Sequence, residues 1–486
     1  MNFIFINPDE MRADSLGCYG HPLVKTPNFD RLAEGGVRFD QCHTTHTVCS
    51  PSRCSYFTGW HPHVNGHRSL WHLLKPDEPN LFKYLSNNGY DIIWYGKNDV
   101  FAPDTFEGVV DQTLNDVITE EDKKKINKGN QNSGNPFSLE DPEYYSFLYN
   151  KMNDYEQTRD YVCVEKAIEF LKSDPDNPFM LFLPTGMPHC PYHAPEGYHD
   201  LYNKDEIPKL KPVCETGKPK FYEKIRESRR LDQVEKDLLR EVNAKYLGMI
   251  SYVDSIYGEL MDTLEETGLD EETAIFVFSD HGDWAGDYGL VEKWPSGMDD
   301  TLTRVPLIIN VPGNARGHVV EECVALHDIM PTVMDLAGIE PEHSIFAQSL
   351  VDQLKGKKGD PKRAVFTEGG YDHPQDEWCF EGRESVQTSL LDEEHIYYPK
   401  VKLQQDEPET VCRSTMIRTT SHKLIYRTKQ INELYDLEKD PEELNNVYQN
   451  PEYEDIKNKL EKRMLEWYIE TSDAPEWYNH PRGFSE

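Results

Sequence analysis

Short runs of apolar residues alternate with helical patterns over about the first 340 residues of the chain. Five runs are almost wholly apolar: Phe3–Ile6, Ile92–Tyr95, Phe179–Leu183, Ile275–Phe278 and Leu307–Val311. Continuous apolar runs of this length are typical of parallel strands, because both faces of such a sheet are covered. We therefore predict an α/β fold with a mostly parallel sheet flanked by helices.

Two segments between these runs have the period of a helix. Thr26-Pro27 supplies an N-cap and a proline in the first turn, and Gly35-Gly36 ends the pattern. A longer helix is predicted from apolar residues spaced three and four apart: Tyr246, Met249, Ile250, Val253, Ile256, Tyr257, Leu260 and Leu264.

The pattern changes after a linker-like stretch, Leu354–Pro361, which is rich in glycine and lysine. Met416–Arg418 and Lys423–Arg427 alternate between apolar and polar residues, which predicts a small antiparallel sheet. An amphipathic helix from about Glu454 to Tyr468 follows. The chain is therefore predicted to have a larger domain, 1–355, and a smaller α+β subdomain, 362–486.

Composition excludes several classes of partner. The 87 acidic and 51 basic residues give a net charge of -36, which repels nucleic acid and anionic membrane surfaces. The sequence contains no stretch near the ~20 apolar residues that span a bilayer. Met1 runs directly into the first predicted strand, which indicates a buried strand and not a signal peptide. The ten scattered cysteines are expected to be free thiols, so we predict a cytoplasmic protein.

Polar residues follow four of the predicted strands. They are Asp9-Glu10, Lys97, His189 and Asp280-His281. Ligands bind outside the carboxyl ends of strands in open α/β sheets, so these positions are expected to converge. Carboxylate oxygens suit hard cations such as Ca²⁺, and an imidazole extends the choice to Mn²⁺. Either acidic turn alone could be a helix cap, but the two together predict a divalent metal site.

A cluster of cysteine and histidine at 42–49 fits no structural zinc spacing. Its last residue begins Cys49-Ser50-Pro51-Ser52-Arg53, with Thr58-Gly59 beyond, which resembles the signature of the type I sulfatases. The resemblance continues along the chain in the same order. The matching segments are Phe5–Glu10, Leu16–Gly20, Thr26–Ala33, Gly96-Lys97, His189–Tyr192, Ser279–Asp283 with Lys293, Arg304–Leu307, Asp328–Thr332 and Glu433–Pro441.

This resemblance implies an alkaline-phosphatase-like fold in which residues 1–355 form the catalytic domain. A maturation enzyme would oxidise Cys49 to Cα-formylglycine (3-oxoalanine), whose hydrate attacks the sulfur of a sulfate ester. The resemblance also implies one divalent metal ion, for which Ca²⁺ is the first choice and Mn²⁺ and Mg²⁺ are the alternatives. Its implied ligands are Asp9, Asp280, His281 and the oxidised Cys49, with Glu10 as a further candidate.

Other roles carry over in the same way. Arg53 would stabilise the hydrated aldehyde. Lys97, His189 and Lys293 would bind the sulfate oxygens, and His189 or Lys293 would protonate the leaving alcohol. These cationic groups would also let a strongly anionic protein bind an anion.

Four positions depart from the family pattern. Glu10 stands where a second aspartate is usual, and His281 replaces an asparagine, as in choline-sulfatase-like and phosphonate-hydrolase-like members. The usual Lys-x-His is Lys97-Asn98-Asp99, so Asp99 either recognises a substrate hydroxyl or leaves proton transfer to His189. Trp60 replaces the final arginine of the signature.

We therefore predict a sulfatase that hydrolyses a sulfate monoester. We expect the ester to be on a sugar, because sugar sulfates are frequent substrates in the family that this sequence resembles. A phosphonate monoester or phosphodiester hydrolase on the same fold is the first alternative, which His281 favours. A binding protein in which Cys49 stays a thiol is the second.

Overall fold

Eight strands form the central sheet of the protein. The computed structural model describes residues 1–214, 216–382 and 387–474, so the end of the predicted subdomain, 362–486, lies outside the described residues. The strand order is β4-β3-β5-β1-β6-β7-β2-β8. The bounds are β1 Asn2–Ile6, β2 Val37–His43, β3 Asp91–Trp94, β4 Gln112–Thr113, β5 Phe179–Leu183, β6 Thr273–Phe278, β7 Leu307–Asn310 and β8 His318–Ala325.

Fifteen α-helices accompany the strands in the described part of the chain. They are α1 Pro27–Gly35, α2 Cys49–Thr58, α3 Pro62–Asn65, α4 Leu81–Asn87, α5 Pro103–Val109, α6 Leu114–Val117, α7 Glu120–Gly129, α8 Arg159–Lys172, α9 Phe221–Ser228, α10 Lys236–Thr267, α11 Asp300–Thr303, α12 Ile329–Ala337, α13 Val351–Leu354, α14 Tyr398–Asp406 and α15 Glu454–Glu470. The predicted long helix is the 32-residue α10, which ends at Gly268 in a left-handed conformation (φ 75°).

The sheet is mostly parallel, and the apolar runs predicted as strands are confirmed. The parallel direction predicted for Leu307–Val311 is wrong, however, because β7 pairs antiparallel with both β6 and β2. An apolar run is equally suitable for either direction when helices cover both faces. β2 and β8 were not predicted, because their partly exposed positions break the apolar pattern.

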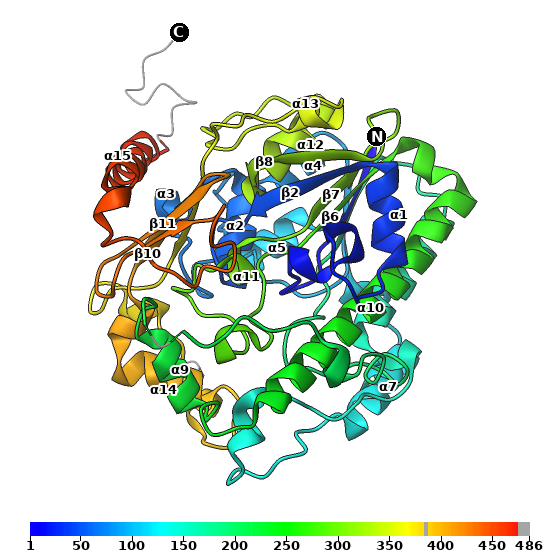
Figure 1. Cartoon of the computed structure of the whole chain (residues 1–486). Helices are drawn as coiled ribbons and strands as arrows, with labels where there is room; N and C mark the ends of the chain where they lie inside the picture. Colours follow the sequence, from blue (N-terminus) through cyan, green and yellow to red (C-terminus); the bar gives the residue numbers. More distant parts are fainter. Residues whose placement is uncertain (215, 383–386, 475–486) are drawn as a thin grey trace.

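Side chains on successive residues of each strand pack on opposite faces of the sheet. Ile4 and Ile6 of β1 contact a cluster with α1, α8 and α10. Phe3 and Phe5 contact a second cluster with α2, α4 and α12. The result is a sheet covered by one helical layer on each face; Figure 1 shows α1 and α10 together along one side of it. This layering leaves the two ends of the strands open for a site.

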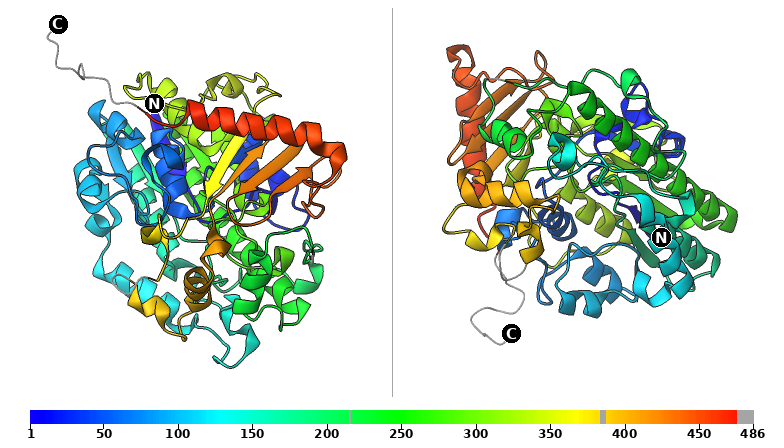
Figure 2. Two further views of the ribbon diagram at one scale, coloured as in Figure 1. Left: turned by 90° about the vertical axis from the view of Figure 1, so that its left-hand side faces the viewer. Right: turned by 90° about the horizontal axis from the view of Figure 1, so that it is seen from below.

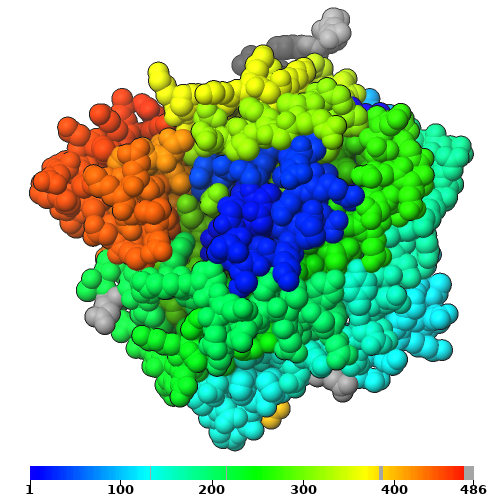
Figure 3. Space-filling model, turned by 45° about the vertical axis from the view of Figure 1, so that its right-hand side comes forward, coloured from blue at the N-terminus to red at the C-terminus, as the bar shows by residue number. Residues whose placement is uncertain are grey.

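The predicted small antiparallel sheet is also confirmed. It has the order β12-β11-β10-β9, with β9 Val365–Gly369, β10 Ser414–Arg418, β11 His422–Arg427 and β12 Glu433–Asp436. α15 packs across one face through Leu460, Met464 and Trp467, as the left view of Figure 2 shows. In Figure 3 these C-terminal elements (orange to red) lie together on one flank of the molecule.

The small sheet is joined to the main body close to the start of α2. The backbone N–H of Glu368 in β9 donates to Thr45 O at 2.8 Å. The division into domains 1–355 and 362–486 stays a prediction. Within the described residues, no helix is both long and apolar enough to cross a membrane.

Candidate active site

The polar turns that follow β1 and β6 lie side by side. These two strands are parallel neighbours, so their carboxyl ends meet at one edge of the sheet. Asp9 therefore lies next to Asp280 and His281, although about 270 residues separate them in sequence. His281 Nε2 is 3.7 Å from Asp9 Oδ1 and 3.8 Å from Asp280 Oδ2. All three side chains are completely buried.

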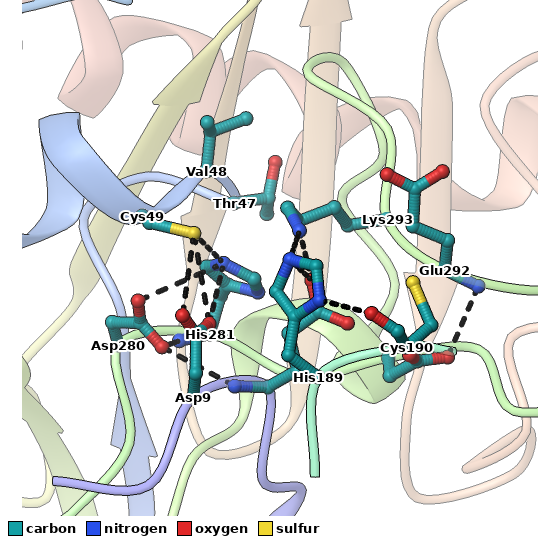
Figure 4. A network of polar contacts seen from close by, with 12 residues as sticks. Asp9, Thr47, Val48, Cys49, His189, Cys190, Asp280, His281, Glu292 and Lys293 are labelled. Carbon is teal, nitrogen blue, oxygen red and sulfur yellow. Dashed lines mark hydrogen bonds and ion pairs between the residues drawn. The ribbon is translucent and has the colours of Figure 1, made fainter. Parts of the chain in front are cut away.

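Cys49 faces these groups from the first residue of α2, as Figure 4 shows. Its Sγ lies 3.2 Å from His281 Nε2 and 3.6 Å from Asp9 Oδ1. The first turn of α2 is held against the turn that follows β6, since Ser52 Oγ donates to Asp280 O at 2.7 Å. The thiol carbon and the two acidic turns are thus brought together, as the sequence predicted.

Four residues, Asp9, Cys49, Asp280 and His281, form a group that suits a metal ion, here called the metal-type group. The candidate ligand atoms of Asp9, Cys49, Asp280 and His281 all lie within 4.8 Å of one another. Two carboxylates and an imidazole are a donor set for Ca²⁺ or Mn²⁺. His281 Nδ1 donates to Gly282 O at 2.9 Å, which leaves the lone pair of Nε2 directed at the other three groups.

Arg53 lies under this group, one turn along α2 from Cys49. Its Nε and Nη2 contact Asp280 Oδ2 at 3.0 and 2.9 Å, and Nη2 is 3.4 Å from Asp9 Oδ2. Nη1 is buried and makes no hydrogen bond with the described residues. Donor capacity therefore remains for an oxygen on the residue at position 49.

Burial and charge set the protonation of the metal-type ligands. Burial alone would raise the pKa of Asp280, but the Arg53 guanidinium outweighs it and lowers that pKa below its usual value. Burial lowers the pKa of His281 to about 3, despite the opposing effect of Asp280. A carboxylate and a neutral imidazole are the forms that coordinate a cation.

Lys97 and Asp99 form the rim of the site. Lys97 Nζ makes an ion pair with Asp9 and a second one, at 2.7 Å, with Asp99 Oδ2. The side chains of Lys97 and Asp99 are each 30% exposed. The side chain of His189 is 25% exposed, whereas that of Asp9 is completely buried. The site therefore opens to solvent between Lys97 and His189.

Glu10 lies apart from the metal-type group. Its Oε1 makes an ion pair with Lys293 Nζ and is 3.3 Å from His189 Nε2. It belongs to a second cluster with His189 and Cys190, and its backbone has a positive φ of 65° that turns the side chain there. The structure thus places Glu10 beside the predicted sulfate-binding residues, and its role as a metal ligand stays a prediction.

Lys293 and His189 contact each other directly. Lys293 Nζ donates to His189 Nε2 at 3.0 Å, while His189 Nδ1 donates to Cys190 O at 2.6 Å. Burial, followed by the charge of Lys293, lowers the pKa of His189 well below its usual value. Burial would also lower the pKa of Lys293, but the Glu10 carboxylate reverses this and raises it. Lys293 is therefore a charged donor beside a neutral imidazole.

Sequence reasoning missed Glu292, the residue that anchors Lys293 in place. Its carboxylate accepts from Arg229 Nη2 at 2.6 Å and from Lys400 Nζ at 2.7 Å, and all three side chains are buried. Its backbone φ is 65°. Nothing in the local sequence distinguishes this glutamate, because both of its partners are more than 60 residues away.

Trp60, by contrast, lies away from the site. It follows the C-terminal end of α2, whereas Cys49 begins that helix, and its Nε1 donates to Ser344 O at 2.7 Å. Trp94, the last residue of β3, packs in the core.

Buried carboxylates, an imidazole and several cations at the carboxyl edge of an α/β sheet are typical of metal-dependent hydrolases of anionic esters. The sulfatase family model matches residues 1–339, well over half of the chain, and the chain therefore belongs to the sulfatase family. The prediction of a sulfuric ester hydrolase is confirmed at this level. A second family model, the C-terminal part of N-sulphoglucosamine sulphohydrolase, matches residues 384–470.

Three similar proteins extend over almost the whole chain. An arylsulfatase of Clostridium perfringens (strain 13 / Type A) is 27% identical and covers 96% of this chain and 93% of its own length. An N-acetylglucosamine-6-O-sulfatase of Bacteroides thetaiotaomicron is 25% identical and covers 97% and 86%. The crystal structure of a phosphonate monoester hydrolase of Agrobacterium radiobacter has a TM-score of 0.76 at 23% identity, covering 97% and 96%, which shows the shared fold.

Proposed function

We propose that this protein hydrolyses a sulfate monoester of a sugar, with Cys49 oxidised to formylglycine as the nucleophile. One observation carries the proposal. Cys49 Sγ lies 3.2 Å from His281 Nε2 in a buried group with Asp9 and Asp280, and cationic side chains surround that group. A mature nucleophile at position 49 would be held next to a divalent metal and next to the charges that bind sulfate.

Asp9, Asp280, His281 and the modified residue 49 would hold the metal, and Ca²⁺ is the proposed ion. When bound, the metal polarises the ester and stabilises negative charge on its oxygens. The pairing of Arg53 with Asp280 orients the guanidinium toward the oxygens of residue 49. Arg53 is completely buried, so its charge would act on the oxygens of the mature residue 49 with little screening by solvent.

Lys97 and Lys293 reach the sulfate position from two different loops. Lys97 reaches it from the end of β3, with its charge shared between Asp9 and Asp99. Lys293 reaches it from the loop after β6 and donates to His189. These two residues bind the sulfate oxygens, and the His189–Lys293 pair supplies the proton that the leaving alcohol needs.

A sugar as the alcohol is supported by two relationships. The C-terminal family model is named for N-sulphoglucosamine sulphohydrolase, and one full-length relative is an N-acetylglucosamine-6-O-sulfatase. Asp99 at the rim is half-buried and can accept a hydrogen bond from a sugar hydroxyl.

The decisive experiment is mass spectrometry of the tryptic peptide Phe39–Arg53 from protein purified from its own host. After alkylation of thiols, the mature peptide carries one alkyl group, on Cys42, and an aldehyde at position 49. An unmodified peptide carries two alkyl groups. A thiol at position 49 in this material would refute the formylglycine mechanism and favour a binding protein.

A phosphonate monoester or phosphodiester hydrolase is the second candidate. The observation that favours it is the imidazole of His281 in the metal-type group, which takes the place of an amide oxygen. Turnover of 4-nitrophenyl sulfate should be compared with that of a phenyl phosphonate monoester at equal concentrations. Faster cleavage of the phosphonate would replace the sulfatase proposal with this one.

A further inference from the structure

A cavity of about 450 Å³ lies beside the rim of the active site. Its wall includes Lys97 and Asn98, which follow β3, and Gly186, three residues before His189. Lys97 belongs to both places, because its Nζ contacts Asp9 and Asp99 in the active site. The volume is within the usual range for a small-molecule site. The cavity is therefore positioned to hold the part of a substrate that extends from the reacting group.

One wall of this cavity is aromatic. Phe106 of α5 lines it and is only partly buried. Its ring packs edge-on against Trp94, with centroids 5.3 Å apart and planes at 84°. Trp94 is buried in the core and so fixes the orientation of Phe106. A rigid aromatic surface beside polar groups suits the apolar face of a sugar ring.

Another wall carries polar groups that are available to a ligand. Arg159, the first residue of α8, is exposed and makes no hydrogen bond or ion pair with any described residue. Asn115 of α6 is likewise exposed, and its amide has no hydrogen-bond partner among those residues. The neighbouring Asp160 makes no ion pair with Arg159; its carboxylate accepts from Gly186 N at 2.9 Å and Met187 N at 2.7 Å.

We propose that this cavity, the Arg159 pocket, binds the sugar ring of the substrate, and that Arg159 pairs with a second anionic group on that sugar. The inference rests on the proposed sulfatase function and names its substrate class, a sugar bearing a carboxylate or a second sulfate. An unpaired guanidinium is the group best suited to either anion, since its donors match two oxygens at once. Asn115 donates to a ring hydroxyl in the same pocket.

The test measures inhibition of 4-nitrophenyl sulfate turnover by two sugars. Glucosamine 2-N,6-O-disulfate carries the second anion, and N-acetylglucosamine 6-O-sulfate lacks it. We expect the disulfate to inhibit the wild-type enzyme about tenfold more strongly, as one charge-assisted hydrogen-bonded pair provides. Arg159→Gln should abolish the difference, and Arg159→Lys should restore part of it. Turnover of 4-nitrophenyl sulfate itself should be unchanged, because this ester does not carry a second anion.

Arg316→Gln is the matched control. Arg316 is also exposed, makes no polar contact with the described residues, and lines a different cavity beside Asn310, at the end of β7. This variant should keep the tenfold difference. Equal inhibition by both sugars in the wild type, or a difference that survives Arg159→Gln, would overturn the proposal.

Failure of the Arg159 pocket can be distinguished from failure of the proposed sulfatase function. If no 4-nitrophenyl sulfate is cleaved by mature enzyme, the proposed function fails. Calorimetric titration of the same two sugars into wild type and Arg159→Gln then tests the pocket directly. Tighter binding of the disulfate that depends on Arg159 supports it, and equal binding refutes it.

Discussion

Replacing Glu292 by glutamine removes the negative charge from a buried group of three residues. Arg229 and Lys400 donate to its two carboxylate oxygens at 2.6 and 2.7 Å, and no side chain of the three is more than 4% exposed. Glutamine keeps the shape but removes the negative charge that the two buried cations share, and its NH₂ group points a donor at one of them. Breaking such a pair costs about 3–5 kcal/mol.

The lower end of that range applies here. Lys400 keeps a second contact with Glu381 at 3.4 Å, and Arg229 also donates to Tyr145 O at 3.3 Å. We therefore expect Glu292→Gln to lower the free energy of unfolding by about 3 kcal/mol at pH 7. Because Lys293 is the next residue, turnover of 4-nitrophenyl sulfate should also fall.

The dependence on pH follows from the sign of the shift. Burial would raise the pKa of Glu292, but Lys400 and Arg229 outweigh it and lower that pKa. A lowered folded-state pKa contributes stability that is complete above the unfolded value of about 4.3 and is lost as pH falls through the folded value. The difference between wild type and variant should thus be constant from about pH 6 to 8 and shrink below about pH 4.3.

Urea unfolding followed by tryptophan fluorescence measures this difference. Asp406→Asn is the control, because it breaks the Lys402–Asp406 pair on α14, whose side chains are 47% and 54% exposed. An exposed pair of this kind contributes little to the free energy of unfolding, because water screens the two charges. If Glu292→Gln cost no more than this control at pH 7, the buried group would not hold the loop that carries Lys293.

Three further perturbations address the site itself. Cys49→Ala should reduce turnover of 4-nitrophenyl sulfate at least about a thousandfold and shift the free energy of unfolding by less than about 2 kcal/mol; residual activity near wild type would disprove the nucleophile. Removal of divalent metal by a chelator should abolish turnover and lower the unfolding midpoint, because two buried carboxylates lose their cation. Ca²⁺ should restore both, whereas restoration by Mn²⁺ alone would show that the His281 imidazole decides the metal. Asp99→Asn should lower KM for 4-nitrophenyl sulfate, because it removes a negative charge beside Lys97. The same variant should raise KM for a sugar sulfate whose hydroxyl donates to Asp99. A change of KM in the same direction for both substrates would contradict a role of Asp99 in recognising the sugar.

Much of the site is readable from the sequence because each component is local. Each predicted strand is a continuous apolar run, and the polar residues that follow it occupy the carboxyl end. The segment from Cys49 to Arg53 forms the first turns of one helix, so its two functional residues share a face. For these reasons the apolar strands of the sheet and the two acidic turns could be predicted, whereas the place of the thiol beside them was implied by the family resemblance.

Tertiary structure decided what depends on distant partners. The direction of β7 is set by its pairing with β6 and β2, and an apolar run does not encode it. Glu10 follows Asp9 directly, yet its positive φ and its ion pair with Lys293 turn it into a different cluster. Glu292 acquires its role from Arg229 and Lys400, which the chain brings together only on folding. The sequence by itself determined the apolar strands and the chemistry at their ends, because these depend on neighbours a few residues away. Charge pairing depends on contacts in space, and therefore only the folded chain decided which charges meet.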